Sequence, residues 1–134
     1  MASSGAWAGR RTLVRMSSGP PGWPDRVPPA GVAGWEQAAV SWLLDQCPAD
    51  YRAYAAWRRH PAALAWMATR HLEAQLEAMR GAWRDVRPEL GPALPPGTIG
   101  DVLESLAREG LRLRANHRAA GLLLEALRLR APIA

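Results

Sequence analysis

The 134-residue chain has no lysine and no phenylalanine, and it has only one asparagine and two isoleucines. All 17 of its basic residues are therefore arginine. The depleted residues share AT-rich codons, so a GC-rich genome is the simplest cause of the bias. Because the arginine content is partly a codon effect, it is weaker support for nucleic-acid binding than the same charge would otherwise be.

Cysteine is almost absent too. The single Cys47 excludes a disulfide within one chain and any cysteine-based zinc site. A lone thiol fits a reducing compartment, and we expect a cytoplasmic protein. No run approaches the roughly 18 apolar residues that cross a bilayer, so no membrane partner is expected. The first residues also lack the apolar stretch of a secretory signal peptide.

The patterns that usually accompany catalysis are missing as well. The only histidines are His60, His71 and His117, and none belongs to a Glu-x-x-His or His-x-x-x-His pair. There is no P-loop, no glycine-rich dinucleotide turn and no G-x-S-x-G. Cys47 lies at a predicted helix start, where the dipole can lower a thiol pKa, but nothing around it marks a nucleophile. We predict a non-enzymatic protein with no catalytic residue, metal or cofactor, in which His117 is a hydrogen-bonded core residue.

What is present indicates one domain behind a tail. Residues 1–30 contain four glycines and five prolines without an apolar period, which predicts a disordered tail. The stretch "RRTLVRM" superficially resembles a transit peptide, and the alternative that we favour is a true start at Met16. Residues 31–134 are long enough for a single domain with a modest core.

Within residues 31–134 the apolar spacing is helical. A stripe of Trp35, Ala39, Trp42 and Leu43 predicts a first helix, and Pro48 suits the start of a second short one. Long helices are predicted over residues 61–87 and from Thr98 onward, separated by a proline-rich break. The fold class expected is all-α: a helical bundle of two short helices packed on a long antiparallel pair with coiled-coil-like 4-3 spacing.

The stretch "YRAYAAWRRHP", residues 51–61, is the one that most resembles a ligand site. On a helix Tyr51, Tyr54 and Trp57 would span an arc of about 120°. Arg52 and Arg59 would point the opposite way and only Arg58 would lie beside the arc, so we expect this face to pack into the core. The alternative is a pocket for a planar or anionic ligand formed by Tyr54, Arg58 and His60.

The last helix supplies the functional hypothesis. Its stretch "AAGLLLEALRL", residues 119–129, is apolar almost all round, which a surface helix of a monomer should not be. We therefore predict partner binding through Leu122, Leu123 and Leu129. The expected function is that of a structural or adaptor module acting by helix-mediated protein association, with a homo-oligomer as the favoured form.

A small nucleic-acid-binding or regulatory protein is the alternative function. Residues 98–134 carry six arginines and four acids, a net charge of +2. Arg108, Arg112 and Arg118 are the candidate phosphate-binding residues. Glu104 and Glu109 dilute this row, and no helix-turn-helix pattern precedes it.

Residues 34–79 also carry a resemblance to other proteins. The Trp35 helix, the "CPADYRAY" turn, the "RRHP" junction and the arginine-rich closing helix resemble a pattern of small uncharacterised helical proteins of high-GC actinobacteria. The resemblance implies an origin and a helical fold, but it implies no activity and no site residues.

Overall fold

A computed structural model of the chain describes residues 19–130, and all regular structure in this range is helical. The all-α helical bundle expected from the sequence is thus confirmed. Residues 1–18 lie outside the described residues, and with them the Met16 alternative and most of the predicted tail. The elements in chain order are α2 (Trp35–Asp45), η1 (Ala49–Ala53), α3 (Ala55–Arg59), α4 (Pro61–Leu90), η2 (Gly91–Ala93) and α5 (Thr98–Arg130).

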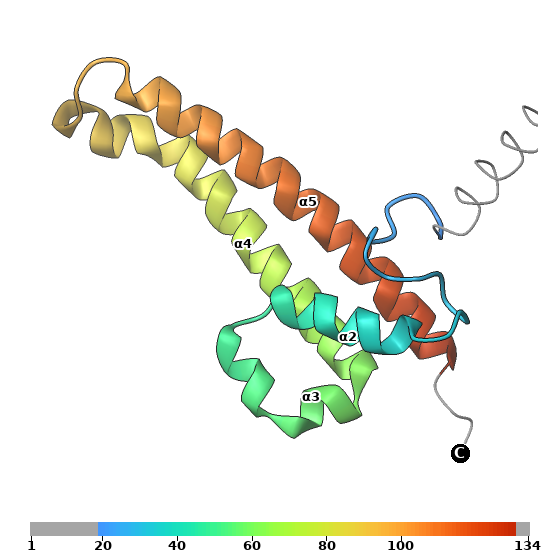
Figure 1. Cartoon of the computed structure of the whole chain (residues 1–134). Coiled ribbons are helices and arrows are strands. Elements are labelled where there is room, and N and C mark those ends of the chain that lie inside the picture. Colours follow the sequence, from blue (N-terminus) through green and yellow to red (C-terminus); the bar gives the residue numbers. More distant parts are fainter. Residues whose placement is uncertain (1–18, 131–134) are drawn as a thin grey trace, which may run out of the picture.

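A hairpin of the two long helices dominates the molecule (Figure 1). α4 and α5 run antiparallel side by side, connected at one end by η2. With 30 and 33 residues they are about 45 and 50 Å long. Leu72 and Leu76 of α4 and Leu113 of α5 are buried along the contact, as the 4-3 spacing predicts.

α4 ends later than expected. The sequence predicted an end at Arg87, before the proline-rich break, but the helix continues through Pro88 to Leu90. Proline cannot donate a backbone hydrogen bond to the residue four positions earlier, which costs most in a helix interior. Here Pro88 lies in the last turn, on an exposed stretch, where little of the helix remains to be disrupted.

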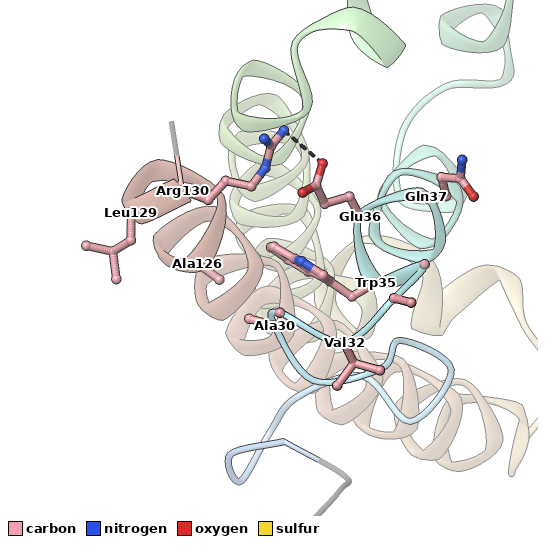
Figure 2. Close-up of a pocket in the computed structure, with 11 residues that line it drawn as sticks. Ala30, Val32, Trp35, Glu36, Gln37, Ala126, Leu129 and Arg130 are labelled. Carbon is pink, nitrogen blue, oxygen red and sulfur yellow. Dashed lines mark ion pairs between the residues drawn. The ribbon is translucent and has the colours of Figure 1, made fainter. Parts of the chain in front are cut away.

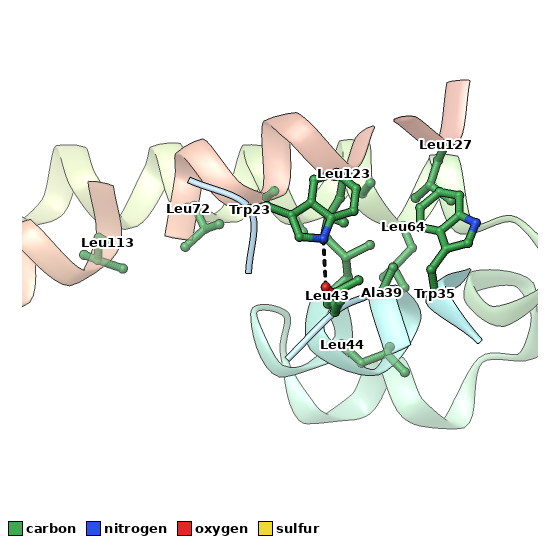
Figure 3. Close-up of a cluster of buried hydrophobic side chains, with 14 of the residues drawn as sticks. Trp23, Trp35, Ala39, Leu43, Leu44, Leu64, Leu72, Leu113, Leu123 and Leu127 are labelled. Atoms are coloured by element: carbon green, nitrogen blue, oxygen red, sulfur yellow. Dashed lines mark hydrogen bonds between the residues drawn. The ribbon is translucent and has the colours of Figure 1, made fainter. Parts of the chain in front are cut away.

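The other end of the hairpin carries the main core (Figure 3). α2 lies across α4 and α5 there, and its Trp35, Ala39 and Leu43 are buried as predicted. They pack in one cluster with Leu64 of α4 and Leu123 of α5. Trp42 of the predicted stripe is only half-buried. We call this end, with its short helices, the proximal half.

The predicted disorder is wrong for residues 19–30. Trp23 and Val27 are buried in the core, and the Trp23 indole N–H donates hydrogen bonds to the carbonyl oxygens of Val27 at 2.9 Å and Pro28 at 3.2 Å. The Trp23 and Trp35 rings are 6.2 Å apart. One large aromatic side chain buries about 150–250 Å², which offsets the entropy of ordering a short, proline-stiffened segment. The domain therefore does not begin at residue 31.

Residues 48–60 do not form the single helix that the sequence predicted. The 3₁₀ turn η1 ends at Ala53, the next residue, Tyr54, has an extended backbone at φ −98° and ψ 107°, and the short α3 follows. Tyr51 and Trp57 stack with ring centroids 4.8 Å apart and partly face the core, as expected. Tyr54 is exposed, because the extended residue turns its side chain out of the shared face.

Candidate functional site

The predicted ligand pocket at Tyr54, Arg58 and His60 is not assembled. Arg58 donates a hydrogen bond to the Arg52 carbonyl oxygen at 2.6 Å and lines a surface hollow of about 380 Å³ beside α2. Tyr54 and His60 are exposed and do not line this hollow. The break at Tyr54 separates side chains that a continuous helix would have grouped.

Tyr51 has a partner that sequence reasoning missed. Its hydroxyl lies 2.8 Å from His71 Nε2 on α4, and the two rings meet edge to face at 5.3 Å. Partial burial raises the pKa of Tyr51, with smaller contributions from Cys47 and Tyr54. This contact attaches η1 to α4. No local spacing could have revealed it, because the two residues lie 20 positions apart in different elements.

Cys47 is not set up as a nucleophile. Burial raises the pKa of its thiol to about 11, and the opposing effect of Arg52 is smaller. The thiol is therefore protonated at neutral pH, whereas a reactive cysteine requires the thiolate. Among residues 19–130, no group of three or more His, Cys, Asp or Glu side chains is arranged to hold a metal ion.

The arginines proposed for phosphate binding have partners within the chain. Arg108 pairs with Glu104 at 3.0 Å, and Arg112 pairs with Glu109. Arg118 reaches the Pro21 carbonyl oxygen at 3.5 Å and packs over Gly22. The three arginines therefore do not form the row of free cations that was predicted. Two of them form local ion pairs, and the third contacts residues 19–30.

The three leucines predicted to bind a partner have different environments. Leu123 is fully buried in the core, because α2 and the 19–30 segment cover that side of α5, so its assignment to a partner surface is wrong. Leu122 is partly buried against the same cluster. Leu129 alone is open, with 85% of its surface exposed.

Leu129 lies at a shallow hollow of about 830 Å³ near the end of α5 (Figure 2). Trp35 and Ala126 line this hollow, and an ion pair of 2.9 Å between Arg130 and Glu36 spans it. In Figure 2 the Leu129 side chain points away from the Trp35 ring. The hollow therefore offers little apolar depth at the leucine itself.

A second apolar surface lies at the other end of the hairpin, which we call the distal half: residues 76–90 of α4 and 98–114 of α5. In Figure 1 this half extends beyond α2, α3 and residues 19–30. A groove of about 460 Å³ runs here between α4 and α5. We call it the distal groove; its lining residues are Leu76, Met79, Arg80, Trp83, Leu106, Ala107, Gly110, Leu111 and Arg114.

The distal groove exposes large apolar side chains on both helices. Trp83 of α4 is 50% exposed and Leu111 of α5 is 66% exposed. Trp83 continues the 4-3 spacing of Leu72, Leu76 and Met79, but among residues 19–130 no further element covers its outer side. Leu111 falls outside the 4-3 repeat, so the sequence pattern did not identify it. Two arginines, Arg80 and Arg114, border the groove.

His117 lies beyond the groove on α5 and also differs from expectation. It was predicted to be a core residue, but its side chain is 38% exposed and its Nε2 lies 3.3 Å from a carboxylate oxygen of Glu73. Its place in the 4-3 repeat puts it at the edge of the contact between the two helices, and no third element within residues 19–130 covers it there. It bridges α5 to α4 at the surface.

Comparisons with known proteins add no assignment. No family model, no curated protein and no solved structure matches the chain. The resemblance to small actinobacterial helical proteins thus stays a prediction. Among the described helices, none has the length and apolar character that would let it cross a membrane.

Proposed function

We propose that the chain is a non-enzymatic helical module that works by protein association in the cytoplasm, in the first place with copies of itself. The distal groove is its contact surface. The observation that carries the proposal is the exposure of Trp83 and Leu111 on two adjacent helices, around a groove also lined by Leu76, Met79 and Leu106.

Burial of this surface supplies the driving force. Large apolar side chains contribute about 1.5–3 kcal/mol each when they pass from full exposure to full burial. Buried tryptophans near the centre of an interface are the residues that most often dominate binding. Single exposed apolar residues are ordinary on protein surfaces, but a contiguous exposed apolar patch marks an interaction site.

The alternative of nucleic-acid binding has weaker support on α5 than association has in the distal groove. Arg108 and Arg112 each face a glutamate of the same helix, and such a pairing dilutes the attraction for phosphates. The remaining exposed arginines are spread over several elements. We therefore propose the association module alone.

Light scattering over a concentration series tests the function, with the variants Leu111→Glu and Leu129→Glu. Both leucines are exposed on α5, but only Leu111 lines the distal groove. We expect the wild-type chain to associate at tens of micromolar. Leu111→Glu should weaken association about tenfold or more by placing a charge in the apolar contact, and Leu129→Glu should leave it nearly unchanged.

Two outcomes would contradict the proposal. A wild-type chain that stays monomeric throughout the series would contradict self-association. If Leu129→Glu weakened association as much as Leu111→Glu, the contact surface would include the end of α5 and would not be the distal groove alone. Circular dichroism of each variant shows whether the helices are intact.

A further inference from the structure

Four exposed charges flank the distal groove along α4. Glu73, Glu77, Arg80 and Arg84 lie within an arc of about 60°, at 100° per residue. Their side chains are 59% to 74% exposed. Arg80 itself lines the groove, beside Leu76 and Trp83. Charges that flank an apolar seam in this way select the partner and its direction in helical bundles.

The order of these charges along α4 is self-complementary in one direction only. The acidic pair comes first and the arginine pair second. The pairs Glu73 with Arg84 and Glu77 with Arg80 are both centred between residues 78 and 79. A copy of α4 turned end for end about this point therefore places each glutamate opposite an arginine. A parallel copy would place each charge opposite the same charge.

We propose that the distal groove is occupied by a second copy of this chain, packed antiparallel along α4, and this inference rests on the proposed function. Glu73 and Glu77 of each copy then face Arg84 and Arg80 of the other. A two-fold axis of this kind is the commonest symmetry of soluble oligomers, and its interface must be complementary to itself. The product is a four-helix bundle formed by two hairpins packed face to face.

The present partners of the four charges do not prevent this exchange. Arg80 meets Glu77 at 3.5 Å, Arg84 pairs with its neighbour Asp85, and Glu73 contacts His117. All are exposed pairs, which typically contribute about 0–1 kcal/mol. One turn further out, Arg70 would approach Arg87 of the other copy. Arg70 lies over the Trp66 ring of its own helix, 5.0 Å from the centroid, which limits this like-charge contact.

The size of the surface fits a stable dimer. When the second copy is turned end for end about the point between residues 78 and 79, its residue 67 lies level with Leu90 of the first copy. The two α4 helices then overlap over about 36 Å. Two helices side by side are about 20 Å wide, which makes a footprint of about 700 Å². Stable interfaces bury about 800 Å² on each partner. Gly110 lines the groove without a side chain, and the space around it is open.

A charge-swap experiment on the full chain tests the antiparallel arrangement. We compare Glu73→Arg, Arg84→Glu and the double variant carrying both changes, and measure dimer dissociation constants by sedimentation. Each single variant converts two attractive contacts per dimer into repulsive ones, and we expect dissociation constants about tenfold higher. The double variant should return to within about threefold of wild type.

The double variant distinguishes contacts between copies from contacts within one. Residues 73 and 84 lie about 16 Å apart along the same helix, too far to pair directly. If the double variant restores the dimer dissociation constant, the two charges must therefore meet between two copies. As an independent measure, spin labels at Leu90→Cys in a Cys47→Ser background should lie about 35 Å or more apart. A parallel dimer would bring them within about 15 Å.

The outcomes separate this inference from the proposed function. Association that depends on Leu111 but shows no effect of the single charge changes, or no restoration by the double variant, overturns the antiparallel dimer and leaves the association module standing. A short distance between labels at residue 90 does the same. A chain that is monomeric at every concentration overturns both.

Discussion

At the scale of single residues, Trp23 holds residues 19–30 against the core. Trp23 lies in a segment whose composition is that of a disordered tail, and it is nevertheless 7% exposed, with its indole N–H bonded to two carbonyl oxygens. Composition averages over a window, whereas one aromatic side chain can hold a short segment if a complementary site exists. That site is formed by α2 and α5, which no local pattern reveals.

Replacing Trp23 by Ala should lower the free energy of unfolding by about 3–5 kcal/mol, because the substitution removes a large buried side chain and its hydrogen bond. Trp66, which is 50% exposed, is the matched control, and Trp66→Ala should cost less than about 1 kcal/mol. Urea unfolding of both variants measures the difference. Equal losses would show that residues 19–30 contribute little to the core.

At the scale of elements, the sequence predicted the helices better than their ends. The 4-3 spacing located α4 and α5, and the stripe beginning at Trp35 located α2. The errors fall where the local signals conflict with the surroundings. Pro88 is tolerated because it lies in a last turn. The predicted helix over residues 48–60 breaks at Tyr54, and Tyr51 before the break contacts His71 of α4.

Glycines inside and outside the helices should respond oppositely to alanine. Gly110 lies within α5 with open space around it, so Gly110→Ala should stabilise the chain by about 0.5–1 kcal/mol. Gly22 has φ +92°, and a Cβ there would lie 2.5 Å from Arg118 Nε, so Gly22→Ala should destabilise it. Thermal unfolding of both variants shows whether each substitution raises or lowers stability. Destabilisation by Gly110→Ala would indicate that the groove floor is closer packed than the hairpin geometry implies.

At the scale of the whole molecule, the two halves of the hairpin are unequally supported. Among residues 19–130, the proximal half packs against α2 and the 19–30 segment, while the distal half is held by the contact between α4 and α5 and by η2 at its end. Buried leucines concentrate in the proximal half, at Leu64, Leu72, Leu123 and Leu127. A four-helix arrangement of two copies would give the distal half the second layer that the single chain lacks.

Hydrogen exchange should reveal this inequality. In the Leu111→Glu variant, amides of residues 80–106 should exchange at least about tenfold faster than those of residues 64–72 and 119–127, because opening them breaks fewer apolar contacts. In the wild-type chain the difference in amide exchange rate between the two halves should narrow as protein concentration rises, because association covers the distal half. Equal protection of both halves in the variant would contradict the picture of an unsupported distal half.

The candidate site illustrates the limit of pattern reasoning. The apolar excess on α5 was interpreted as a partner surface, but Leu123 is covered by α2 and residues 19–30 of the same chain. The exposed surface lies instead at Trp83 and Leu111. The sequence pattern identified apolar faces, and it contained no information on which of them the short elements would reach.

The sequence by itself determined the all-α fold class and the approximate positions of α2, α4 and α5, because helical periodicity depends on neighbouring residues. Only the tertiary structure decided where the short elements and the segment around Trp23 pack, since that depends on contacts between residues far apart in the chain. The same packing buries Leu123, pairs Arg108 and Arg112 with glutamates, and leaves the distal groove uncovered.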